Sequence, residues 1–180
     1  MGHFAEMRRL RGEIADNAEN VTARRDLAKI WLKRRPRRAI ALLQEARRRD
    51  RESAELPLLL GMALHRVGRD EEALPLLVEA ARKSEKQMYG EAYLVAGKAL
   101  RALGRFAESE DAFARYLAIN SSSVEGRVLV ACVRRELKDA AGAKAATREA
   151  LDTFAAVPRF RRRAELKWYL RARLMTLGLA

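Results

Sequence analysis

Small residues recur along the chain at nearly constant spacing, and this recurrence constrains the fold more than any other feature. One series repeats at intervals of 34, 36 and 34 residues: Ala39, Ala73, Ser109 and Ala143. A second series lies 11 or 12 residues earlier, at intervals of 33, 36 and 34: Ala28, Gly61, Gly97 and Ala131. Self-similarity at this period is typical of helical-repeat arrays, in which each repeat buries its apolar face against its neighbours.

The small residues indicate two antiparallel helices in close contact within each repeat. A long side chain at the crossing point would hold the two backbones apart, whereas larger residues three or four positions away fill the space on either side. Gly68 and Gly104 fall where the first helix of a pair should end, and glycine adopts a left-handed C-cap at low cost. Asp70 and Asp139 are predicted to cap the helices that follow.

The second and third repeats carry a pattern that resembles the tetratricopeptide repeat (TPR) family. In the second repeat the matching residues are Leu60, Gly61, Leu64, Gly68, Ala73, Leu77 and Ala80. In the third repeat they are Tyr93, Gly97, Leu100, Gly104, Phe113 and Tyr116. The fourth repeat departs from the family, with Arg134 and Thr147 where large apolar side chains are usual.

We therefore expect an all-α fold, a right-handed α-solenoid of about four helix-turn-helix (TPR-like) repeats with N- and C-terminal capping helices. The predicted organisation is one continuous domain. It has an N-terminal capping helix within 1–19, repeats at about 20–52, 53–86, 87–120 and 121–154, and a basic amphipathic capping helix within 155–180.

Both ends of the chain carry amphipathic patterns suited to covering a solenoid. At the front, one apolar stripe comprises Phe4, Met7, Leu10 and Ile14. At the back, one helical face comprises Phe160, Ala164, Trp168, Ala172 and Met175, and a second comprises Leu166, Leu170, Leu174 and Leu177. This apolar arc is wider than a cap needs. Either the helix packs deeply on the fourth repeat, or the leucine face stays free for a protein partner, a second copy of the chain or a lipid surface.

The sequence argues against catalysis. The chain has one cysteine, Cys132, and two histidines, His3 and His65, which excludes an internal disulfide and any multi-cysteine zinc site. No phosphate-binding loop, HExxH or GxSxG motif occurs, and no apolar run approaches the length of a membrane span. We expect a non-enzymatic protein that needs no cofactor and no metal.

The TPR resemblance implies that the first helices of the repeats line a concave face that holds an extended peptide or a helix. Carried over repeat by repeat, the groove positions are Arg25, Lys29, Lys33, Leu58, Met62, His65, Arg66, Leu94, Lys98, Arg101, Val128, Cys132 and Arg135. This set mixes apolar residues with cations, and its only acids lie at the fringes: Glu55, Glu91, Glu125 and Glu136. The resemblance and this composition predict an acidic protein partner.

The net charge of +13 is concentrated at two places. Residues 24–51 hold 12 Lys and Arg against three acids, and residues 157–180 hold seven against one. These clusters leave two alternatives to a peptide-binding scaffold. One is an adaptor at an anionic membrane surface, or the soluble part of a membrane-anchored protein; the other, less favoured, is nucleic-acid binding. The arginine-rich composition suggests a bacterial source, and we expect a cytoplasmic location, with membrane association as the alternative.

Overall fold

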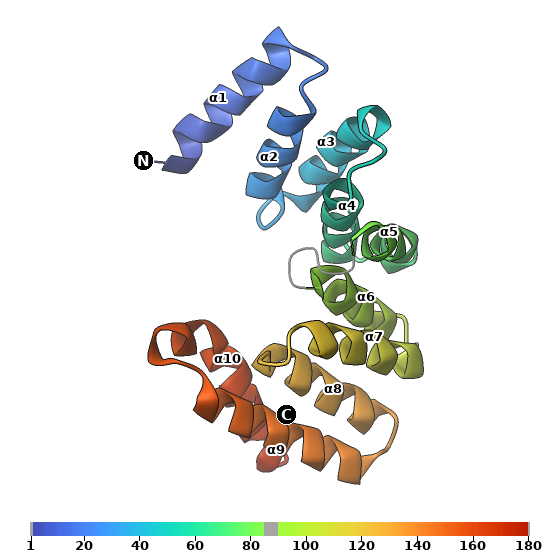
Figure 1. Ribbon diagram of the computed structural model, residues 1–180, viewed down its shortest axis with the longest axis vertical. Helices are drawn as coiled ribbons and strands as arrows, with labels where there is room; N and C mark the ends of the chain where they lie inside the picture. Colours follow the sequence, from blue (N-terminus) through green and yellow to red (C-terminus); the bar gives the residue numbers. More distant parts are fainter. Residues whose placement is uncertain (1, 85–89, 180) are drawn as a thin grey trace. The chain divides into compact units, whose positions relative to one another are not determined.

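The computed structural model describes residues 2–84 and 90–179, whose regular elements are ten α-helices (Figure 1). Within each repeat the two helices pack against each other, and within each half of the chain consecutive helices are neighbours in space. This confirms the predicted fold class, an all-α helical-repeat protein of the TPR-like solenoid type. The chain divides into two compact units, residues 1–88 and 89–180; that it forms one continuous domain stays a prediction.

The first unit holds an N-terminal helix and two helical pairs. Its helices are α1 (Gly2–Asp16), α2 (Val21–Trp31), α3 (Pro36–Arg49), α4 (Glu55–Arg66) and α5 (Asp70–Lys83). Helix α1 packs against α2 through Leu10, which is buried with Ala23 and Leu27, while Met7 and Ile14 lie at the edge of this cluster. Phe4 does not join the stripe, because its side chain is 80% exposed at the first turn of α1.

The second unit holds two helical pairs and the last helix. Its helices are α6 (Glu91–Ala102), α7 (Phe106–Ile119), α8 (Val124–Glu136), α9 (Ala140–Ala156) and α10 (Arg159–Thr176). Figure 1 shows α10 folded back beside α8 and α9, and it contacts both of them. Its inner face contributes Trp168, Ala172 and Met175 to the apolar cluster beneath it, and the ring of Tyr169 stacks on Phe154 of α9 at 4.3 Å.

The small residues that define the period are buried at the helix crossings, as predicted. All eight positions of the two series are buried: Ala28, Ala39, Gly61, Ala73, Gly97, Ser109, Ala131 and Ala143. A β-carbon added to Gly97 would lie 2.5 Å from the ring of Phe113, and one added to Gly61 would lie 2.7 Å from the side chain of Leu77. Ser109 donates a hydrogen bond of 2.7 Å to the carbonyl oxygen of Gly97. At Gly61 and Gly97, therefore, the backbone of the first helix contacts a side chain of the second helix directly.

The turns within the last three pairs share one backbone geometry, whereas the turn between α2 and α3 contains no residue with positive φ. Gly68 and Gly104 adopt φ angles of 77° and 74°, as expected for left-handed C-caps, and Lys138 takes the same place in the last pair with φ 63°. Asp139 caps α9 by accepting a hydrogen bond of 2.8 Å from the amide of Gly142, as predicted. The capping prediction for Asp70 is wrong: Asp70 is the first residue of α5, and its carboxylate contacts His65 at the end of α4.

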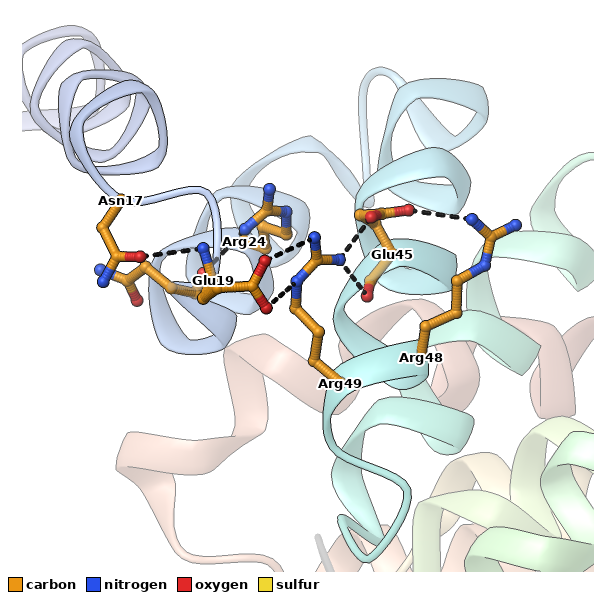
Figure 2. A network of polar contacts seen from close by, with 7 residues as sticks. Asn17, Glu19, Arg24, Glu45, Arg48 and Arg49 are labelled. Carbon is orange, nitrogen blue, oxygen red and sulfur yellow. Dashed lines mark hydrogen bonds and ion pairs between the residues drawn. The ribbon is translucent and has the colours of Figure 1, made fainter.

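A network of ion pairs fastens the loop between α1 and α2 to helix α3 (Figure 2). Arg49 donates hydrogen bonds of 2.8 and 3.1 Å to the carboxylate of Glu19, and it also contacts Glu45, which Arg48 approaches at 3.2 Å. These hydrogen bonds hold the pKa of Arg49 above its usual range. The loop is also braced internally, because the amide of Glu19 donates to Asn17 Oδ1 at 2.9 Å.

Replacing Gly97 with alanine tests the close helix contact. We expect Gly97→Ala to lower the free energy of unfolding by about 1–3 kcal/mol, because the new methyl group overlaps the fully buried ring of Phe113. Gly12→Ala in α1 is the matched control, since nothing lies within 4 Å of its added β-carbon. It should be neutral or stabilise by about 0.5–1 kcal/mol. Urea unfolding measures both, and equal stabilities would contradict the packing argument.

Lys138 offers a second test, of the shared turn geometry. Lys138→Gly should stabilise the protein by about 0.5–1 kcal/mol, because a non-glycine residue at positive φ is strained. Leu137→Gly, one residue earlier at φ −75°, should not stabilise. Thermal unfolding of the two variants, with Gly104→Lys as the reverse substitution, decides the point. A Lys138→Gly protein no more stable than Leu137→Gly would show that the left-handed turn carries no strain.

Candidate functional site

The apolar groove positions predicted from the TPR resemblance lie in the core. Leu58, Leu94 and Val128 are 1%, 3% and 0% exposed, and Cys132 is also buried. Leu94 packs in the cluster around Phe113 and Tyr116. Val128 and Cys132 belong to the cluster beneath α10. These side chains lie in the interior and present little surface to a partner.

Most of the predicted groove cations are already paired with acids. Lys29 Nζ lies 2.5 Å from Glu55 Oε1, and Arg25 approaches the same carboxylate at 3.4 Å. In the second unit, Lys98 Nζ lies 2.6 Å from Glu125 Oε1. Each of these pairs joins the first helix of one repeat to the first helix of the next. Two of the glutamates that the sequence placed at the fringes of the groove, Glu55 and Glu125, therefore neutralise cations within it.

Arg101 makes a looser contact of the same kind, at 3.7 Å from Glu136. Three groove cations, Lys33, Arg66 and Arg135, are exposed and form no ion pair with any described residue. Met62 and His65 are half-buried, and His65 Nδ1 lies 2.5 Å from Asp70 Oδ1. The predicted groove thus divides into core residues, paired charges and a few cations at the ends of first helices.

One of these free cations, Arg135, borders a cavity of about 560 Å³ in the second unit. The cavity opens between α9 and the end of α10, and its apolar wall includes Ala143, Leu151 and Met175. Lys144 and Arg148 stand with Arg135 at its rim. All three are exposed, and no Asp or Glu of the described chain lines the cavity. An apolar wall with a cationic rim suits an acidic segment that carries an apolar anchor.

Of the residues at this cavity, only Arg135 was predicted from the sequence as a binding residue. Lys144 and Arg148 are four residues apart, so they share a face of α9. Thr147, noted as a departure from the TPR pattern, lies between them in the cavity wall, and its hydroxyl donates to Ala143 O at 2.8 Å. The wall also needs Met175 of α10, whose packing the repeat pattern does not specify.

A second cavity, in the first unit, is strongly basic. It measures about 460 Å³ and is lined by five arginines together with Pro36 and Val67: Arg34, Arg35, Arg37, Arg38 and Arg66. None of the five has a carboxylate partner among the described residues. Arg38 lies 5.9 Å over the ring of Trp31. The positive charge predicted for residues 24–51 is therefore left free mainly in the turn between α2 and α3.

The predicted second surface is open. Leu166, Leu170, Leu174 and Leu177 are 44%, 51%, 44% and 69% exposed, whereas the opposite side of α10 packs on α8 and α9. Phe160, expected on the packed face, is 84% exposed instead, because α10 begins only one residue earlier and its first turn projects beyond the cluster. Of the two readings left open by the sequence, the structure fits the one in which a leucine face stays uncovered.

Glu165 is the one acid on α10. Its pKa is raised above the usual value, first because burial penalises the charged carboxylate and second because Glu125 of α8 lies close by. The charges of Arg161 and Lys167 and the backbone of Glu125 offset this only in part. Packing of α10 on α8 therefore makes the ionised form of the Glu165 carboxylate less favourable than it would be in solvent.

The described residues contain no group of three or more His, Cys, Asp or Glu side chains placed to hold a metal ion. Among the helices described, none combines the length and apolar character needed to cross a bilayer. The candidate sites are therefore surfaces and open cavities whose chemistry is electrostatic and apolar.

The pairwise helical packing and the small residues at each crossing define the chain as a protein with a TPR-like fold, and solved structures agree. It is similar to the crystal structure of MamA, with a TM-score of 0.76 and 20% identity over 82% of this chain and 85% of that one. It is also similar to YrrB, described as a TPR protein with an unusual peptide-binding site, with a TM-score of 0.72 and 19% identity over 83% of this chain and 79% of that one.

A third similar structure is TTC0263, a thermophilic TPR protein of Thermus thermophilus, with a TM-score of 0.73 and 20% identity over 95% of this chain and 89% of that one. No protein-family model matches the chain, and no curated protein sequence matches it. At these identities the comparisons establish the fold.

Neutralising Glu165 should stabilise the packing of α10. A carboxylate whose folded-state pKa is raised destabilises the protein above its ordinary pKa, so stability falls as the pH rises from about 4.5 through the raised value. We expect Glu165→Gln to unfold at a higher temperature than the unsubstituted protein at pH 7 and at the same temperature near pH 4. The control is Glu71→Gln, at an exposed position of α5. Equal gains for both variants at pH 7 would contradict the assignment.

Proposed function

We propose that the protein is a non-catalytic scaffold that binds an acidic segment of a protein partner, and that the cavity between α9 and α10 receives it. The observation that carries this proposal is the combination of an apolar wall with three exposed cations, Arg135, Lys144 and Arg148, that form no ion pair with a described residue. Carboxylates of the partner would pair with this rim while one apolar side chain enters the cavity.

The fold supports the proposal in a general way. Proteins with TPR-like folds commonly present a surface to a peptide or a helix, and YrrB is described as having an unusual peptide-binding site. We extend that chemistry to this chain but place the contact on α9 and α10. The cations Lys29 and Lys98 of the concave-face prediction are engaged with glutamates, so an acidic peptide would have to displace those pairs first. The concave groove itself and a cytoplasmic location stay predictions.

Charge reversal at the rim of the cavity tests the proposal. The probe is a synthetic amphipathic peptide that carries four glutamates and two leucines, and its affinity is measured by fluorescence anisotropy at physiological salt. Arg135→Glu combined with Lys144→Glu should weaken binding at least tenfold, since two attractive contacts become repulsive. Arg8→Glu combined with Arg82→Glu changes the net charge by the same amount elsewhere and should weaken it less than threefold.

Two outcomes would overturn the proposal. If both double variants weaken binding equally, the peptide responds only to the net charge. If Lys98→Glu combined with Arg101→Glu abolishes binding while the rim variant does not, the peptide occupies the concave face predicted from the sequence. Helix content and melting temperature are measured for every variant, because reversing Lys98 places a second carboxylate face to face with that of Glu125.

A further inference from the structure

Helix α10 and residues 177–179 hold most of the exposed large apolar side chains among the described residues. Six of the nine exposed large apolar side chains lie between residues 160 and 179: Phe160, Leu166, Leu170, Leu174, Leu177 and Leu179. From Leu166 to Leu177 the leucine row extends for about 16 Å along the helix. Contiguous apolar patches of this kind mark interaction sites more often than scattered exposed residues do.

The same helix carries a dense set of cations. Arg162 donates hydrogen bonds to the carbonyl oxygens of Val157 and Ala155, and Lys167 Nζ lies 4.8 Å over the ring of Trp168. Seven Lys and Arg occur on it, and none forms an ion pair with a described residue: Arg159, Arg161, Arg162, Arg163, Lys167, Arg171 and Arg173. Helical spacing places Lys167 and Arg171 along one edge of the leucine row and Arg173 along the other. Cations therefore border the leucines on both sides, where their flexible side chains can reach past the apolar row.

The charge determines which occupant fits this face. Two copies of the chain meeting through α10 would bring two clusters of seven cations together with only one acid, Glu165, in each, which disfavours a dimer of this kind. A partner helix would need acids on both edges of its own apolar stripe over the full length of α10. An anionic lipid surface supplies negative charge continuously and accepts leucines at the boundary between headgroups and acyl chains.

We propose that the leucine face of α10 docks the protein on an anionic membrane surface. Leu166, Leu170, Leu174 and Leu177 enter the interface, and the flanking Lys167, Arg171 and Arg173 contact lipid phosphates. Helix α10 lies in the plane of the surface while its opposite side remains packed on α8 and α9 through Ala172, which is fully buried. The interaction is peripheral, and it leaves the rim cations of the peptide proposal free, because Arg135, Lys144 and Arg148 belong to α8 and α9.

Co-sedimentation with lipid vesicles tests this docking. The full chain should bind vesicles with 30% phosphatidylglycerol in phosphatidylcholine and should not bind pure phosphatidylcholine vesicles. Leu170→Ser combined with Leu174→Ser should lower the partition coefficient about tenfold, because the leucines supply the apolar contact. The matched control is Val78→Ser combined with Leu137→Ser, two similarly exposed apolar residues outside α10, and it should bind like the unsubstituted protein.

Two sets of charge-removing substitutions distinguish binding through α10 from binding through the overall positive charge of the chain. Lys167→Gln, Arg171→Gln and Arg173→Gln together should lower binding to anionic vesicles by about a hundredfold at low salt. Lys33→Gln, Arg34→Gln and Arg37→Gln remove the same charge from the turn between α2 and α3 and should change binding less than fivefold.

Four results would overturn the proposal. They are no binding to anionic vesicles, equal losses in the two charge series, a leucine variant that binds normally, and a dimer seen by light scattering that the leucine substitutions dissolve. Because the substituted leucines are exposed, unchanged helix content and melting temperature are expected and guard against misfolding. Vesicle binding that survives Arg135→Glu combined with Lys144→Glu would separate this surface from the peptide site.

Discussion

The structure depends on how closely two helix backbones approach each other at the small residues of each pair. At Gly97 the ring of Phe113 occupies the space that a β-carbon would need, and at Gly61 the side chain of Leu77 does the same. This contact sets the distance between the paired helices and thereby the position of every side chain on their outer faces. Larger residues then fill the gaps on either side, so a single repeat carries both the close contact and the core around it.

The repeat pattern of small residues predicted the fold because it records this contact directly. Ala28, Gly61, Gly97 and Ala131 recur at matched positions since each one solves the same steric problem. The left-handed turns at Gly68 and Gly104 were predictable for a similar local reason. The left-handed conformation of Lys138 was not predictable, because lysine has no preference for positive φ. Asp70 was assigned as a cap from its place before a helix, yet it pairs with His65 across the turn.

The binding surface was harder to predict because charge neutralisation depends on neighbours in space. Residue type and position predicted Lys29 and Lys98 as cations available in the groove. In the structure, consecutive first helices lie close enough for Glu55 and Glu125 to form ion pairs with them. Partly exposed pairs of this kind contribute at most about 1 kcal/mol each, so they stabilise little but remove charge that a ligand could use. The cavity near Arg135 and the open leucine face both depend on how α10 packs, and that packing lies outside the repeat pattern.

Because Cys132 is buried beneath α10, the rate at which its thiol reacts measures local opening of the second unit. This sole thiol shares a cluster with Ala172, Trp168 and Met175, so a reagent reaches it only when α10 lifts away or the second unit unfolds. Local opening requires less free energy than global unfolding, and the two differ in their dependence on denaturant. Whatever binds α10 without lifting it from α8 and α9 should slow the modification of Cys132, and whatever detaches it should expose the sulfur.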